Sequence, residues 1–241
     1  MRGDVKIQYR AVLALATVLL LTALSARAQF FMPPQTKPKP LVILDPGHGG
    51  ADLGARTSKN YVEKDFTLRL ARAVKDRLEQ DGAADALLTR ETDRELSPLA
   101  RLEFVNARKA GMFISLHADG GAKLRSHPLK IFIHKPEPAN AAPPPGPWDR
   151  QGDPYAPESG KLAATMAPRL ESAAGRKVEI AATSLMGLGG AGMPAALVEA
   201  ADFSNPEDAI RVEDDAYLAK LADAVAGAVM EYLRVKGARN P

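Results

Sequence analysis

The chain has 241 residues, of which 46% are hydrophobic and 25% charged, values typical of a soluble globular protein. This composition excludes a disordered chain, a collagen-like chain and a protein with many membrane spans. The net charge is +3, but the basic excess lies in residues 1–28, and the remaining residues carry equal numbers of basic and acidic side chains. Nucleic acid is therefore not an expected partner, because phosphate binding needs a basic surface.

Residues 1–28 have the three-part layout of a secretory signal peptide. A basic start precedes an apolar run from residue 11 to about residue 25, and the small-x-small sequence Ala26-Arg27-Ala28 follows. The apolar run is shorter than the roughly 20 residues of a spanning helix, so cleavage before Gln29 is favoured over an uncleaved membrane anchor. We therefore expect an exported protein, in the periplasm, the cell wall or the extracellular space, with no stable membrane span.

Residues 29–39 are rich in proline and polar side chains, which predicts a linker, and one folded domain is expected over residues 40–241. Within that domain, short apolar runs alternate with helical patterns. Strands are expected at residues 41–44, 86–89, 112–116, 129–134, 178–182 and 195–198, and helices at about 66–78, 97–110, 158–173 and 206–235. This alternation predicts a single α/β domain with a mostly parallel, twisted sheet of about six strands flanked by helices.

Two segments have more specific predictions. The last helix has a well-marked start, with Asn205 as the N-cap and Pro206 at the first helical position. Residues 135–157 are rich in proline and contain the chain's one tryptophan. We expect this segment to be a non-helical surface loop, and the alternative is a flap beside the functional site.

Three of the predicted strands end at a side chain suited to metal binding or catalysis: His48, His117 and Glu199. The carboxyl ends of parallel strands meet at one edge of a sheet, where ligands bind in α/β folds. Glu63 lies in the opening turn of the first helix, on the side that faces the sheet, and points at the same edge. Two imidazoles and one carboxylate are a ligand set that catalytic Zn²⁺ takes from proteins, with the fourth position left for water. His48, Glu63 and His117 are therefore a candidate zinc site at the carboxyl edge of the sheet, and without cysteine only histidine and carboxylate ligands are available.

Taken singly, the ligand candidates also have ordinary structural interpretations. A histidine after a strand is often a hydrogen-bonded loop residue, and Glu63 alone would be a favourable charge at a helix N-terminus. Glu199 is different, because it ends an apolar strand, where an unpaired, half-buried carboxylate is costly. The other two histidines, His127 and His134, are expected to be structural.

Several motifs, in order along residues 41–232, resemble the zinc-dependent N-acetylmuramoyl-L-alanine amidases of bacterial cell-wall remodelling. They are DPGHGGADLGA at residues 45–55, Glu63, TRETD at 89–93, Arg101 with Asn106, FISLHAD at 113–119 and MPAALVEAADFSN at 193–205. The resemblance implies that His48, Glu63 and His117 bind zinc and that Glu199 is the catalytic carboxylate.

The sequence departs from the family pattern at a few positions. Leu53 stands where proline is usual, Asp119 where asparagine is usual, residues 111–112 (Gly-Met) where Ala-Asp is usual, and residues 201–202 (Ala-Asp) where Gly-Phe is usual. The last departure lies beside Glu199 and is expected to affect the substrate preference more than the catalytic chemistry.

Some relatives carry an inhibitory helix over the metal. We expect none here, because the proline-rich loop cannot supply a long helix.

The predicted activity is hydrolysis of the amide bond between N-acetylmuramic acid and L-alanine in peptidoglycan, by a monomeric enzyme. Asp45 and Asp119 are predicted to accept hydrogen bonds from the histidine ligands. Two alternatives stay open: an endopeptidase that cuts within the stem peptide, and a catalytically silent wall-binding module on the same fold. The products released from peptidoglycan distinguish them.

Overall fold

The computed structural model describes residue 17 and residues 38–121, 128–138 and 150–239. The predicted signal peptide, apart from Thr17, lies outside the described residues, as do His127 and residues 139–149 of the proline-rich segment. Residues 39–241 form one compact unit. Within the described parts of the chain, no helix is both long enough and apolar enough to cross a membrane.

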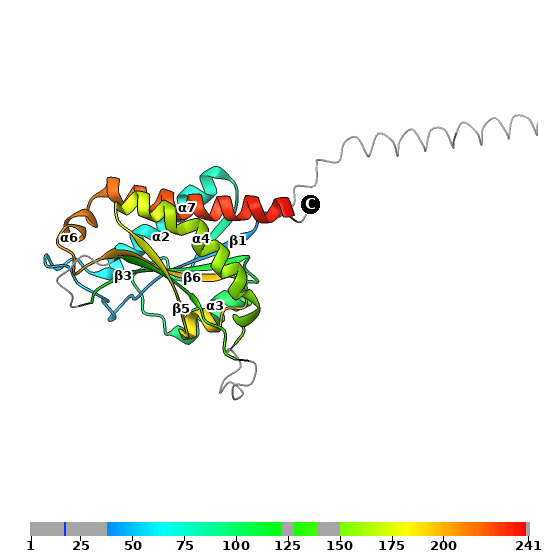
Figure 1. Ribbon diagram of the computed structural model, residues 1–241, viewed down its shortest axis with the longest axis horizontal. Helices are drawn as coiled ribbons and strands as arrows, with labels where there is room; N and C mark the ends of the chain where they lie inside the picture. Colours follow the sequence, from blue (N-terminus) through cyan, green and yellow to red (C-terminus); the bar gives the residue numbers. More distant parts are fainter. Residues whose placement is uncertain (1–16, 18–37, 122–127, 139–149, 240–241) are drawn as a thin grey trace, which may run out of the picture. The chain divides into compact units, whose positions relative to one another are not determined.

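A six-stranded sheet lies at the centre of this unit, with the strand order β2-β1-β3-β6-β4-β5 (Figure 1). The strands are β1 (Leu41–Pro46), β2 (Asp85–Leu88), β3 (Met112–Asp119), β4 (Leu129–His134), β5 (Val178–Thr183) and β6 (Ala195–Asp202). The first three strands and β6 run parallel, whereas β4 is antiparallel to β6 and parallel to β5. The prediction of a mostly parallel α/β sheet is confirmed.

Helices cover both faces of the sheet, because successive strand residues project apolar side chains to opposite faces. One face packs against α2 (Glu63–Asp81), α4 (Ala156–Ala174) and α7 (Asp215–Arg239), and its core includes Val42, Leu44, Ile114 and Val198. The other face packs against α3 (Pro98–Ala107) and the short α5 (Met186–Gly189), around Ile43 and Phe113. Figure 1 shows α4 and α7 above the sheet and α3 below it.

The prediction of one last helix over 206–235 is wrong, since this segment forms two helices, α6 (Asp208–Arg211) and α7. This first helix begins two residues later than expected, with Glu207 rather than Asn205 at its N-cap, although Asn205 Oδ1 accepts hydrogen bonds from the Glu207 and Asp208 amides at 2.8 and 3.3 Å. A second capping residue, Asp214, accepts from the Ala216 amide at 2.8 Å and starts a new helix. The chain therefore contains two helix starts where the apolar pattern suggested one.

The expectation of a non-helical loop over 135–157 is wrong at its C-terminal end. Residues Asp153–Tyr155 form a 3-10 turn, η1, and α4 begins at Ala156. Pro154 and Pro157 lie in the first turns of these elements. A proline is tolerated there because the first backbone N–H groups of a helix have no partner within it.

Candidate metal centre

His48 stands in a tight turn just after β1. Its φ is 61°, and the two following glycines have φ of 128° and 60°, so the backbone turns through the left-handed region. Such a conformation costs a non-glycine residue about 1 kcal/mol or more and needs support from its surroundings. Two arginines supply it: Arg101 Nη2 donates to the carbonyl of His48 at 2.7 Å, and Arg90 Nη2 donates to the carbonyl of Gly47 at 2.8 Å.

Glu63 is the first residue of α2, and its side chain is almost fully buried. Its Oε2 accepts a hydrogen bond from the Ala55 amide at 2.8 Å and lies 3.0 Å from His48 Nε2. Its Oε1 accepts from the Ala118 amide at 2.9 Å and lies 3.0 Å from His117 Nδ1. The carboxylate is thus held by two backbone amides between the two imidazoles.

His48, Glu63 and His117 fit a metal ion. Their ligand atoms all lie within 4.8 Å of one another, and a tetrahedral ion with bonds of about 2.1 Å would bring them to roughly 3.4 Å apart. Two glycines keep the space around these side chains free. A Cβ on Gly47 would lie 2.3 Å from the His117 ring, and one on Gly54 would lie 2.5 Å from Glu63 Oε2. Sequence reasoning brought these three ligand candidates together, and the structure places them side by side.

The charges of this cluster depend on each other. Burial raises the pKa of Glu63, but hydrogen bonds with His117 and His48 outweigh it and hold the pKa well below its usual range. Burial lowers the pKa of His48, but hydrogen bonds with Glu63 and Asp52 outweigh it and leave the pKa raised. Both ring nitrogens of His48 face a carboxylate oxygen, at 3.0 and 2.8 Å. This arrangement favours the protonated imidazolium, so a metal ion has to displace a proton in order to bind.

Glu199 lies on β6, directly beside His117 on β3 in the parallel register. Residues paired in this way project to the same face of the sheet. The side chain is half-buried, and within the described part of the chain its Oε2 has no hydrogen-bond partner. Burial, followed by the negative charge of Asp119, raises the pKa of Glu199 to about 7. A carboxylate that exchanges a proton near neutral pH beside a metal-binding cluster is a candidate general acid or base.

The prediction that Asp45 and Asp119 accept hydrogen bonds from the histidine ligands is wrong, because both carboxylates have other partners. Buried Asp45 accepts hydrogen bonds from Thr89, Arg101 and Ser115 at 2.5, 2.5 and 2.8 Å. Asp119 accepts from the Gly121 amide, and its Oδ2 lies 3.9 Å from Lys130 Nζ.

Besides Glu63, the carboxylate that contacts His48 is Asp52, whose Oδ2 lies 2.8 Å from His48 Nδ1. Sequence reasoning missed it, although its position four residues after His48 in the same loop was a usable signal. It also missed Arg90, which belongs to the TRETD motif and is almost fully buried. His134, expected to be structural, lies away from the metal centre, with its Nε2 2.5 Å from Asp153 Oδ1.

A cavity of about 330 Å³ adjoins the cluster on the face covered by α3 and α5. His48, Asp52 and His117 form its polar end, and Leu102, Leu185 and Met186 belong to its apolar walls.

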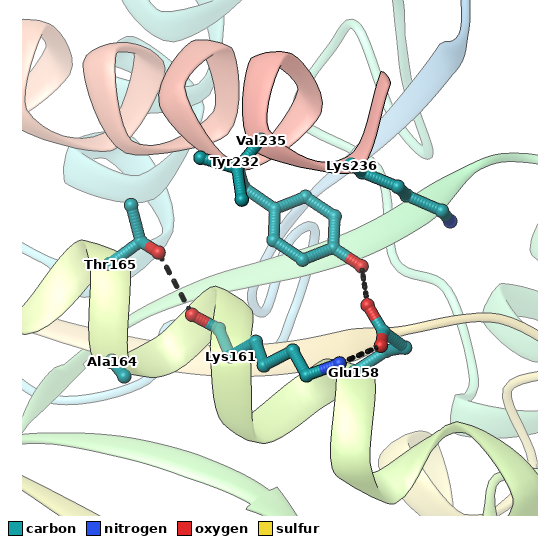
Figure 2. Close-up of a pocket in the computed structure, with 7 residues that line it drawn as sticks. All are labelled: Glu158, Lys161, Ala164, Thr165, Tyr232, Val235 and Lys236. Carbon is teal, nitrogen blue, oxygen red and sulfur yellow. Dashed lines mark hydrogen bonds and ion pairs between the residues drawn. The ribbon is translucent and has the colours of Figure 1, made fainter. Parts of the chain in front are cut away.

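A second cavity, of about 450 Å³, lies between α4 and α7 (Figure 2). There Glu158 joins Lys161 and the Tyr232 hydroxyl by hydrogen bonds of 2.5 and 2.8 Å, and no residue of the metal centre takes part. The first cavity is therefore the one beside the candidate chemistry.

The chain is similar to known proteins over most of its length. The family Amidase_3, described as N-acetylmuramoyl-L-alanine amidase, matches residues 42–231. The amidase AmiA of Salmonella typhimurium is 38% identical over 98 residues, which cover 41% of this chain and 34% of AmiA. A germination-specific N-acetylmuramoyl-L-alanine amidase of Bacillus subtilis is 27% identical over 215 residues, 82% of this chain and 81% of the relative. The chain thus spans about a third of AmiA but most of the Bacillus relative.

Solved structures have the same fold. The catalytic domain of CwlV from Bacillus (Paenibacillus) polymyxa matches with a TM-score of 0.68 and 26% identity, covering 81% of this chain and 99% of the domain. The amidase AmiC2 of Nostoc punctiforme matches with a TM-score of 0.68 and 25% identity, covering 83% and 99%. Both are described as N-acetylmuramoyl-L-alanine amidases.

Proposed function

Since the chain belongs to the Amidase_3 family of N-acetylmuramoyl-L-alanine amidases, we propose that it is a zinc hydrolase of peptidoglycan. It cleaves the amide bond between N-acetylmuramic acid and L-alanine and releases the stem peptide. The observation that carries the proposal is the cluster His48–Glu63–His117 with Glu199 beside it on the neighbouring strand. Membership of the family indicates which bond is cleaved, and these four side chains could carry out its hydrolysis.

His48, Glu63 and His117 would hold the ion. Two imidazoles and a carboxylate are a ligand set that catalytic zinc uses in proteins, and the chain has no cysteine that could be a ligand. Zinc bound there would act as a Lewis acid that acidifies water and polarises a carbonyl group. The backbone amides of Ala55 and Ala118 keep the Glu63 carboxylate oriented toward both imidazoles.

Glu199 moves the proton. As a base it accepts a proton from the attacking water, and as an acid it delivers that proton to the nitrogen of L-alanine as the amide bond breaks. In the metal-free protein burial raises the pKa of Glu199 to about 7, and its Oε2 has no hydrogen-bond partner among the described residues, which suits a group that exchanges protons. Because Glu199 contacts the leaving nitrogen in this scheme, the released peptide lies on the β6 side of the centre.

Export completes the proposal. Peptidoglycan lies outside the cytoplasmic membrane, and residues 1–28 have the layout of a secretory signal peptide. We propose that the mature protein begins at Gln29 and acts as a monomer in the periplasm or the cell wall.

The test is to incubate the purified protein with isolated peptidoglycan, with and without a chelator, and to identify the soluble fragments by mass spectrometry. Chelator-sensitive release of peptides with a free L-alanine amino terminus, from intact muramic acid, is the expected result. Shorter peptides would replace the proposal with endopeptidase activity. No release by zinc-loaded protein would favour a wall-binding module instead.

Two variants separate the roles at the site. Glu199→Gln should retain its zinc but hydrolyse peptidoglycan about 100-fold more slowly or worse, the usual effect of removing a general acid–base. His117→Ala should lose both zinc and activity, because it removes a ligand. Metal content measured by atomic spectroscopy checks both, and loss of zinc from Glu199→Gln would contradict the assignment of Glu199.

A further inference from the structure

Four charged or titratable side chains form a row across the sheet at the metal centre. His117 on β3 pairs with Glu199 on β6, Glu199 pairs with Lys130 on β4, and Lys130 pairs with Glu179 on β5. Paired residues on adjacent strands project to the same face, and the strands lie about 4.8 Å apart. Lys130 is therefore the next side chain along the sheet after Glu199, on the side away from the metal ligands.

The ammonium group of Lys130 is loosely held. Its ion pair with Asp119 Oδ2 measures 3.9 Å, too long for a hydrogen bond, and its Nζ lies 5.9 Å from the centroid of the Phe132 ring. For comparison, Lys64 Nζ makes hydrogen bonds of 2.8 and 2.6 Å with a backbone carbonyl and Asp93. The Lys130 side chain is 33% exposed. Its three N–H donors are thus available to a ligand that reaches this part of the centre.

The leaving peptide carries a matching group. In peptidoglycan the residue after L-alanine is D-glutamate, which is joined through its side-chain carboxyl, so its α-carboxylate is free. That carboxylate lies about two residues, or roughly 7 Å, from the alanine nitrogen in an extended chain. If Glu199 delivers its proton to that nitrogen, the carboxylate falls within reach of the lysine one strand further on. An ammonium–carboxylate hydrogen bond is among the stronger polar contacts available to a protein.

We propose that Lys130 binds the free α-carboxylate of the second stem residue and makes the enzyme prefer stem peptides that keep this carboxylate over those in which it is a carboxamide. This proposal rests on the proposed amidase function. Lys130 acts as a specificity-determining residue on the leaving-group side, and the metal ligands lie on the other side of Glu199.

The experiment compares two soluble muropeptides that differ only at the second stem residue, one with the free α-carboxylate and one with the carboxamide. Wild type should prefer the carboxylate. Lys130→Met, which keeps the length but removes the charge, should lower kcat/KM for the carboxylate substrate about 10-fold, mainly through KM, and leave the carboxamide substrate within about 2-fold. Lys130→Arg should restore the preference. The control is Lys177→Met, because Lys177 forms a similarly loose pair of 3.8 Å with Glu179.

Binding of the product peptide gives a readout that needs no turnover. Calorimetry with the released peptide that carries the free carboxylate should show about 10-fold weaker binding to Lys130→Met than to wild type or Lys177→Met. Equal affinities would overturn the proposal. An equal loss of kcat/KM for both substrates would also overturn it, because Lys130 would then act only through Glu199. Failure of wild type to cleave either substrate would instead refute the amidase function, while the binding measurement still tests Lys130.

Discussion

Replacing Asp52 with asparagine tests how the protein holds His48 for a metal. The two carboxylate oxygens of Asp52 have different partners: Oδ2 faces His48 Nδ1 at 2.8 Å, and Oδ1 accepts from the Gly54 amide at 3.1 Å. Asparagine has a single acceptor oxygen, so one of the two contacts is lost. If the Gly54 contact persists, an NH₂ group faces the histidine N–H, and the imidazole loses the partner that orients it and raises its basicity.

The magnitude follows from the exposure of Asp52. Loss of the hydrogen-bond partner of a metal-binding histidine typically lowers metal affinity by roughly 10- to 100-fold. The Asp52 side chain is 55% exposed, so water replaces part of the lost contact, and we expect the lower end, about 10-fold. This corresponds to about 1.4 kcal/mol of binding free energy. The zinc affinities of wild type and Asp52→Asn are measured by competition with a chelating dye at constant pH.

Asp93→Asn is the matched control. Asp93 is similarly exposed, at 49%, and braces the same loop through the Gly50 amide and Lys64, but it contacts no metal-ligand candidate. Its zinc affinity should stay within about 2-fold of wild type. A loss as large as that of Asp52→Asn would show that loop order, rather than the orientation of His48, controls affinity. An unchanged affinity in Asp52→Asn would refute the role of Asp52 directly.

Two further predictions concern stability. Asp45→Asn should lower the free energy of unfolding by about 3 kcal/mol in urea titrations of metal-free protein, because it leaves the mostly buried Arg101 without its counter-ion. The control Asp215→Asn breaks an exposed pair with Arg69 and should lower the free energy of unfolding by less than about 0.5 kcal/mol. Equal losses in the two variants would contradict this reasoning. The second prediction is that zinc should raise Tm more at pH 8 than at pH 6. Because the pKa of His48 is raised in the folded state, protonated His48 stabilises the metal-free protein below pH 6.5, and this stabilisation is lost as pH rises through the pKa of His48 in the folded protein. Zinc binding becomes more favourable over the same pH range, because the ion no longer has to displace a proton from His48. Calorimetric scans with zinc and with chelator measure both shifts, and a larger shift at pH 6 would count against it.

Sequence patterns alone were enough to predict the strands and most of the candidate metal centre. Apolar runs predicted all six strands. Central strands such as β1 and β3 are buried on both faces and need continuous apolar sequence, whereas the edge strands β2 and β5 are partly exposed. Chemistry-bearing residues follow β1 and end the apolar parts of β3 and β6, and the common carboxyl edge of parallel strands is sufficient to predict that His48, His117 and Glu199 lie together. Glu63 could be added because helical periodicity places it in the first turn, facing the sheet.

The polar groups that support those residues became clear from the folded arrangement of the chain. Asp45 and Asp52 are both acidic residues close to His48 in sequence, but Asp45 points into the sheet toward Arg101, and only Asp52 reaches the imidazole. The place of Lys130 beside Glu199 depends on the antiparallel pairing of β4 with β6, between segments about 70 residues apart. Local periodicity reflects which face of an element is buried, and it carries no information on which distant element covers that face. Strand order and side-chain partners are settled when the whole sheet packs, because most buried polar groups then find their partners among residues far along the chain.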